Sequence, residues 1–157
     1  MKNVLAIGCL VAIAAAGSRA EAQVDIPGPA VGYDLMLRTG QLVAVDARVG
    51  YLWLVARKEY VGVGLIGEAG LGLGGPSAGV GPVTMFDCYH AMGCMSVAVQ
   101  AKGFRPAWLS SWDKSWLAGG ELSFGYYLLK ATVAVFRPPG GSGDPLVSIG
   151  AGLQLFY

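Results

Sequence analysis

The stretch YVGVGLIGEAGLGLGG, residues 60–75, alternates between apolar side chains and glycine. Valine, leucine and alanine occupy the odd positions from 61 to 73 except Gly67, and glycine or Glu68 occupies the even positions except Ile66. A period of two is typical of a β-strand with one apolar face. We therefore expect one side of this strand to be lined by small residues and the other by large apolar ones.

The same stretch contains Gly62-x-Gly64-x-x-Gly67, the glycine spacing of a dinucleotide-binding turn. Asp87 follows about 20 residues later, where such a site places its ribose-binding acid. That site requires a helix to begin at the third glycine. The residues that follow, EAGLGLGGPSAGVGP, oppose a helix because glycine costs about 1 kcal/mol and proline about 3 kcal/mol at interior positions. The pattern predicts a strand, and no cofactor is expected.

The same alternation recurs along the chain and predicts a single domain of about eight strands, with no second domain. The predicted strands are 31–39, 41–54, 60–73, 78–86, 95–103, 116–126, 129–136 and 147–157. The strand at 78–86 is the weakest because Pro82 interrupts it. Residues 23–30 are expected to be a disordered lead-in. Between the sixth and seventh strands, the only sign of a turn is at residues 128–129, where the apolar side chains change from even to odd positions.

The first 22 residues have the features of a secretory signal peptide. Lys2 precedes an uncharged apolar run over residues 4–17, and the small residues Ala20 and Ala22 then mark a cleavage site. The run is too short for a membrane-spanning helix, which needs about 20 apolar residues. The predicted domain is therefore 23–157, in which nine basic and nine acidic residues remain from the 11 and 10 of the whole chain. A net charge of zero gives no basic patch for nucleic acid.

Eight charged residues fall within the predicted strands, all on the polar or small-residue face, and four are basic and four acidic. They are Asp34, Arg38, Asp46, Arg48, Glu68, Lys102, Glu121 and Lys130. A soluble sandwich or lipocalin-like barrel would turn this face to water and bury the apolar one. A membrane barrel would do the reverse. The polar faces are rich in glycine, serine and alanine, and the strands are about ten residues long, which suffices to cross a bilayer when tilted. Both features favour charges enclosed within a transmembrane barrel.

Aromatic residues gather toward the predicted strand ends, as in the interfacial girdles of transmembrane barrels. They are Tyr33, Trp53, Tyr60, Phe104, Trp108, Trp116, Phe136 and Tyr157, and Trp112 lies midway between two of the tryptophans. Tryptophan suits a membrane interface, because its ring is apolar and its N–H needs a partner. We expect Trp53, Trp108, Trp112, Trp116 and Tyr157 to lie at the membrane interface.

The last twelve residues, LVSIGAGLQLFY, place apolar side chains at every second position and end on Tyr157. Together with the signal peptide, this ending resembles that of the small outer-membrane β-barrel proteins of Gram-negative bacteria. The resemblance covers 23–157 in pattern only. It implies an antiparallel up-and-down β-barrel, transmembrane, with both termini in the periplasm. Outer-membrane lipid and the barrel-insertion machinery are the partners that it implies.

Two further motifs offer alternative chemistry. Gly75-Pro-Ser77-Ala-Gly79 matches the nucleophile elbow of hydrolases, and Asp87 and His90 follow in the order of an α/β-hydrolase. No helix follows the serine, so a lipid-modifying hydrolase is the weaker interpretation. Cys88 and Cys94 flank His90 and could ligate a metal, although a structural zinc site usually needs four ligands. In an exported chain, a disulfide between the two cysteines is the preferred interpretation.

These patterns favour a non-enzymatic outer-membrane β-barrel with a role in envelope structure or surface contact. Two alternatives remain open: a soluble periplasmic or secreted β-domain that binds a small apolar ligand, and an outer-membrane lipid-modifying hydrolase. At eight strands, side chains fill a barrel, so an open pore is not expected.

Overall fold

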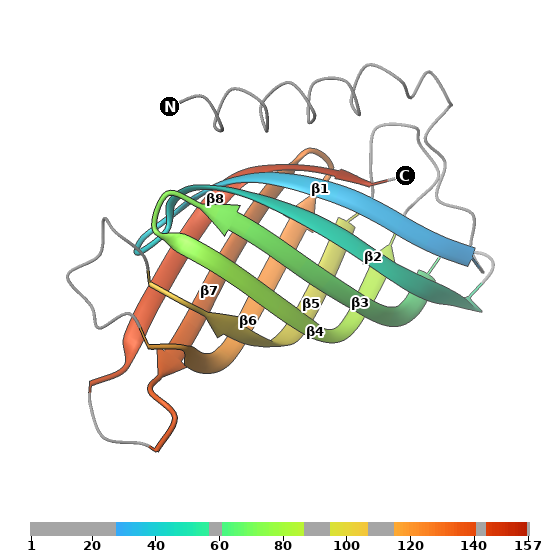
Figure 1. The fold of residues 1–157 in the computed structure, drawn as a ribbon. Helices are drawn as coiled ribbons and strands as arrows, with labels where there is room; N and C mark the ends of the chain where they lie inside the picture. Colours follow the sequence, from blue (N-terminus) through green and yellow to red (C-terminus); the bar gives the residue numbers. More distant parts are fainter. Residues whose placement is uncertain (1–27, 57–60, 87–94, 107–114, 141–143, 157) are drawn as a thin grey trace.

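The computed structural model describes residues 28–56, 61–86, 95–106, 115–140 and 144–156. Its eight antiparallel strands close into an up-and-down barrel in which each strand pairs with its sequence neighbours and β1 pairs with β8 (Figure 1). The all-β barrel predicted from the sequence is thereby confirmed. The strands are β1 (Gly28–Arg38), β2 (Leu42–Ala56), β3 (Val61–Gly72), β4 (Gly75–Phe86), β5 (Met95–Phe104), β6 (Leu117–Tyr126), β7 (Leu129–Arg137) and β8 (Leu146–Phe156). Among the residues described, no helix is long and apolar enough to cross a membrane.

Two predicted boundaries are wrong. Residues 28–30 belong to β1, where they pair with residues 50–52 of β2. β4 begins at Gly75 rather than near residue 78, and it continues through Pro82, which pairs with Leu65 of β3. On its other side, the β4–β5 pairing stops at Val80 and resumes at Val83, because proline cannot donate a backbone hydrogen bond. The barrel therefore accommodates Pro82 at the cost of a gap in one ladder.

The turn that parity alone predicted lies between β6 and β7, at Tyr127 and Leu128. Tyr127 has a φ of 51°, an uncommon value for a residue with a side chain. Gln154 of β8 holds this turn, because its backbone N–H donates to the Leu128 carbonyl at 2.8 Å. Its side-chain Nε2 also donates to the Tyr127 carbonyl at 3.0 Å. Contacts from a neighbouring strand thus stabilise a turn that contains neither glycine nor proline.

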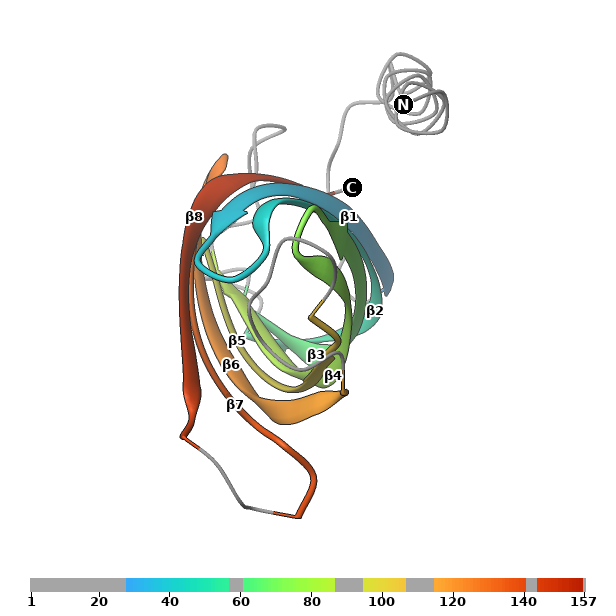
Figure 2. The same ribbon diagram turned by 60° about the vertical axis from the view of Figure 1, so that its left-hand side comes forward.

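Large apolar side chains point outward from the barrel. Val43, Val63 and Leu153 are 41%, 38% and 52% exposed, whereas Asp46 and Lys130 are 0% and 3% exposed. The viewing direction of Figure 2 runs closer to the barrel axis and shows the strands as a single wall around the interior. The polar face of each strand therefore lies inside the barrel, and the apolar face lies outside.

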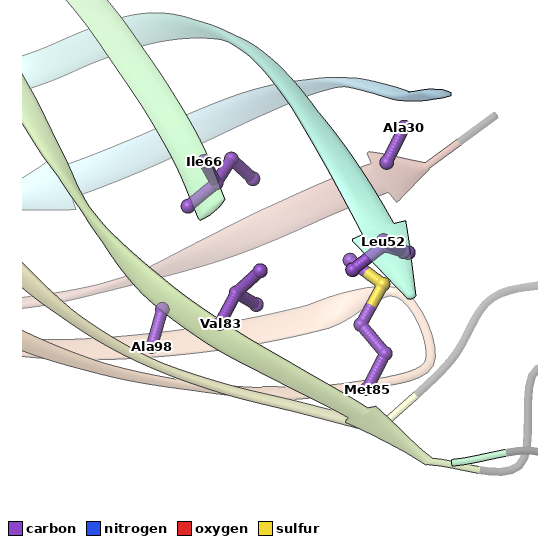
Figure 3. Packing of buried hydrophobic residues seen from close by; sticks show 6 residues of the cluster. All are labelled: Ala30, Leu52, Ile66, Val83, Met85 and Ala98. Atoms are coloured by element: carbon purple, nitrogen blue, oxygen red, sulfur yellow. The ribbon is translucent and has the colours of Figure 1, made fainter. Parts of the chain in front are cut away.

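The two ends of the interior are filled by apolar clusters. Near the end where β1 begins and β8 ends, an inward cluster comes from β1 to β5 (Figure 3): Ala30, Leu52, Ile66, Val83, Met85 and Ala98. At the opposite end, Phe104, Leu117, Ala134 and Phe136 form a second cluster against which Leu146 packs. The rings of Phe104 and Phe136 lie 5.6 Å apart between centroids.

These two phenylalanines correct one sequence interpretation. The sequence predicts both in an interfacial girdle, but Phe104 is 2% exposed and Phe136 is 4% exposed, and both point inward. Residues two positions apart share a face of a strand, so Phe104 has the inward parity of Lys102. Proximity to a strand end does not determine which face an aromatic residue takes.

Candidate functional site: a buried ion network

The middle of the barrel interior holds all eight strand charges identified in the sequence, and each is buried. We call this set the ion network: Asp34, Arg38, Asp46, Arg48, Glu68, Lys102, Glu121 and Lys130. Its members come from β1, β2, β3, β5, β6 and β7. Because inward positions recur every second residue, the alternation of each strand places its charges on the enclosed face.

One half of the ion network links β2, β1, β7 and β3. Arg48 pairs with Asp34 Oδ1. Lys130 Nζ lies 2.6 Å from Asp34 Oδ2 and 3.0 Å from Glu68 Oε2, so this ammonium joins two carboxylates on different strands. Asp34 is thereby held between two cations, and Glu68 connects this half to the other.

The second half continues through β5 and β6 and returns to β1 and β2. Lys102 pairs with Glu68 and lies 2.9 Å from Glu121 Oε2. Arg38 lies 3.4 Å from Glu121 Oε1 and 2.6 Å from Asp46 Oδ2. It also approaches Glu68 Oε1 at 3.5 Å. The complete path alternates in sign and ends with a carboxylate on the strand where it began.

Enclosing charges is favourable only where each finds partners, because an unpaired buried ion carries a large desolvation penalty. The alternating path satisfies that condition and leaves the interior neutral. The apolar clusters at both ends separate the ion network from the barrel mouths. This arrangement builds a rigid, closed interior and does not resemble a catalytic site, in which a reactive group must meet its substrate.

Buried amides extend the ion network, although the sequence interpretation included only charged residues. Gln41 accepts a hydrogen bond from Arg38 at 3.2 Å and donates one to the Gly75 carbonyl at 3.3 Å. Gln154 accepts one from Arg48 at 3.5 Å. Parity along the closing strand already placed Gln154 on the polar face, so a count of all polar residues there would have found it.

Interior glycines make room for these side chains. A Cβ at Gly70 would lie 1.8 Å from Asp46 Oδ1 and 2.9 Å from Ser77 Oγ. A Cβ at Gly150 would lie 2.6 Å from Arg38 Cγ. Of the three glycines that suggested a cofactor loop, Gly62 and Gly64 lie on the inward face of β3, Gly67 lies on the outward face, and no helix follows them. A Cβ at Gly64 would collide with the backbone of β2, so this glycine allows the two strands to approach closely.

Gly70→Ala is expected to destabilise the barrel by about 1–3 kcal/mol, the usual cost of overpacking a filled interior. The matched control is Gly120→Ala on the outer wall, where an added Cβ would meet only the Gln100 carbonyl, at 3.7 Å. Urea unfolding of the two refolded variants measures the difference. Equal midpoints would contradict the packing assigned to Gly70.

Three carboxylates of the ion network, Asp34, Asp46 and Glu68, lie within 4.8 Å of one another. Such a group could in principle ligate a cation. Lysine and arginine nitrogens already occupy the positions next to these oxygens. The charge of the carboxylates is therefore compensated from within the chain, which makes this a poor metal site.

The other predicted site residues divide into those that the structure describes and those that it does not. Trp53 and Trp116 are 50% and 49% exposed on the outer surface, and their place at a membrane interface stays a prediction. Ser77 lies inside the barrel at 4% exposure, where a lipid outside the barrel cannot reach it. The remaining predictions lie outside the described residues: Cys88, Cys94, His90, Asp87, Trp108, Trp112, Tyr157 and the signal peptide over 1–22.

The outer wall also has a groove of about 470 Å³ across β1 to β4. Small residues, among them Ala47, Gly67 and Ala69, line it together with Val31 and Tyr33. The groove is continuous with the exposed apolar surface and brings no nucleophile and base together.

Comparison with known proteins adds no assignment. No family model matches the chain, and neither a curated protein nor a solved structure matches it significantly.

Proposed function

We propose that this chain is a non-enzymatic β-barrel of the outer membrane, with a role in envelope structure or surface contact. The observation that carries the proposal is the inverted distribution of polarity. Large apolar side chains such as Leu35, Leu122 and Ile149 are 50–59% exposed, whereas all eight members of the ion network are buried. A hydrocarbon solvent favours this arrangement, and water opposes it.

The size of the apolar surface supports lipid over a protein partner. Exposed apolar residues occur on every one of the eight strands, so the surface surrounds the barrel rather than forming one patch. Soluble monomers rarely expose a contiguous apolar patch larger than a few hundred Å². Exposing apolar surface to water costs roughly 25 cal/mol per Å² of that surface. A bilayer covers such a surface on all sides at once, and the closed barrel leaves no strand edge unpaired in lipid.

The filled interior argues against transport through the barrel and against ligand binding inside it. Charges paired across the middle and apolar clusters at both ends occupy the space that a channel or an apolar ligand would need. The purified protein is expected to show no steady conductance in a planar bilayer. A stable open level at low voltage would contradict a structural role for the interior.

Fractionation of the producing cells tests the proposal. We expect the protein in outer membranes, extracted only by detergent and lacking residues 1–22. It should migrate differently on a gel before and after boiling, because a barrel resists unfolding in detergent at room temperature. Recovery from the periplasm as a monodisperse protein without detergent would overturn the proposal.

A further inference from the structure

The outward faces of the strands carry almost no charge. In the described part of the chain, the single charged outward residue within a strand is Arg137, the last residue of β7. Arg105 follows the last residue of β5 and is also exposed. β5 and β7 both end opposite the end of the barrel where β1 begins (Figure 1), so the two arginines lie at the same end.

Strand pairing brings these arginines beside an exposed tryptophan. Phe104, the last residue of β5, pairs with Leu117, the first residue of β6, so Arg105 and Trp116 are the next residues beyond this pair at the same end of the barrel. Arg137 pairs with Ala118, two residues from Trp116 on the same face. The Trp116 ring lies over the outer wall, where its Cε3 would be 3.6 Å from a Cβ at Gly103. We call Arg105, Trp116 and Arg137 the basic rim.

The basic rim borders the apolar wall. Val99, Leu122 and Val133 are paired across β5, β6 and β7 and form the outward surface toward the middle of the barrel. They lie four residues from the Ala118–Arg137 pair, which is about 13 Å along the strands. An arginine on the lipid face of a barrel costs about 2–4 kcal/mol at the bilayer midplane but only about 0–1 kcal/mol near the interface. Tryptophan is likewise enriched at the headgroup level.

We infer that the basic rim binds the phosphate groups of lipids in the leaflet at this end of the barrel. The inference rests on the proposed membrane location. Guanidinium groups form charge-assisted, often bidentate, hydrogen bonds with phosphate oxygens. Trp116 and the adjoining apolar wall place both arginines at the headgroup level, so the phosphate source is the membrane rather than free phosphate in solution. Among the described residues, Asp144 is the exposed carboxylate at this end.

The test uses the full-length mature protein inserted into phosphatidylcholine vesicles with and without phosphatidic acid, which carries a phosphate monoester. Lipids retained on detergent extraction are counted by native mass spectrometry. We expect an enrichment of phosphatidic acid of about fivefold, as for two exposed charge-assisted contacts. Arg105→Gln with Arg137→Gln should remove the enrichment, and the corresponding lysine pair should retain part of it. Asp144→Asn is the matched control and should not reduce it.

The outcomes separate the two proposals. Wild-type protein that inserts into phosphatidylcholine but shows no enrichment overturns the basic rim alone. The basic rim is also overturned if the double glutamine variant keeps the phosphatidic acid enrichment, or if Asp144→Asn abolishes it. Inorganic phosphate that displaces the bound lipid at millimolar concentration would indicate an ordinary anion site and overturn the lipid assignment. Failure of the wild type to insert into either vesicle overturns the membrane location and the basic rim with it.

Discussion

Glu68→Ala is expected to lower the free energy of unfolding by about 3–5 kcal/mol, the cost of removing one partner from a buried ion pair. Glu68 pairs with both Lys102 and Lys130 and approaches Arg38. Its loss leaves the interior with an uncompensated positive charge that water cannot reach. Urea unfolding of protein refolded in detergent micelles, followed by tryptophan fluorescence, measures the change.

Two variants distinguish the missing charge from the missing side chain. Glu68→Gln keeps the shape of the side chain but removes its charge. It should lower the free energy of unfolding by most of the amount expected for Glu68→Ala. Asp144→Asn removes a carboxylate that is exposed at the barrel mouth. It should alter stability by no more than about 0.5 kcal/mol, as is usual for surface changes. If Glu68→Gln unfolded at the wild-type midpoint, the ion network would not be the source of interior stability.

Leu122→Arg is expected to destabilise the barrel in lipid vesicles by about 2–4 kcal/mol, the cost of a cation at the middle of a barrel's lipid-facing wall. Leu122 is 53% exposed and lies between Val99 and Val133 on the outer surface. In a soluble protein, the same substitution at a half-exposed site would be nearly neutral. The direction and size of the effect therefore report on the solvent around the barrel.

Ala118→Arg is the matched control, because Ala118 shares the outward face of β6 but pairs with Arg137 at the strand end. It should cost about 0–1 kcal/mol for its position near the interface and at most about 1 kcal/mol more for the like charge of Arg137 directly opposite, which is still less than Leu122→Arg in the same vesicles. Unfolding midpoints in phosphatidylcholine vesicles compare the two substitutions. Equal and small effects would argue that water, rather than lipid, covers the wall.

The sequence allowed the strands and their faces to be predicted to within a few residues, even at the β6–β7 turn, where no glycine or proline marks the break. The exceptions have local causes. Residues 28–30 contain glycine and proline and carry no long alternation, so their pairing with β2 was not predicted. Pro82 lacks a hydrogen bond only toward β5, and the ladder to β3 on its other side keeps it in the strand.

The partners within the ion network could not be predicted in the same way. Lys130 and Asp34 are 96 residues apart, and their contact depends on the stagger of all the strands between them. The inward direction of the two phenylalanines, in contrast, follows from the alternation along each strand. Phe104 shares the face of Lys102, and Phe136 shares the face of Lys130. The stagger between distant strands is not encoded in the residues next to these charges.

By itself, the sequence determined which residues share a face of each strand, because side chains alternate with a period of two whatever lies around them. It also determined that acidic and basic residues are equal in number on the face that carries the small residues. Only the tertiary structure decided that this face is enclosed and which charges meet across it. The physical reason is that closure and register are properties of the whole sheet: the eight strands must pair around a ring before an inside exists.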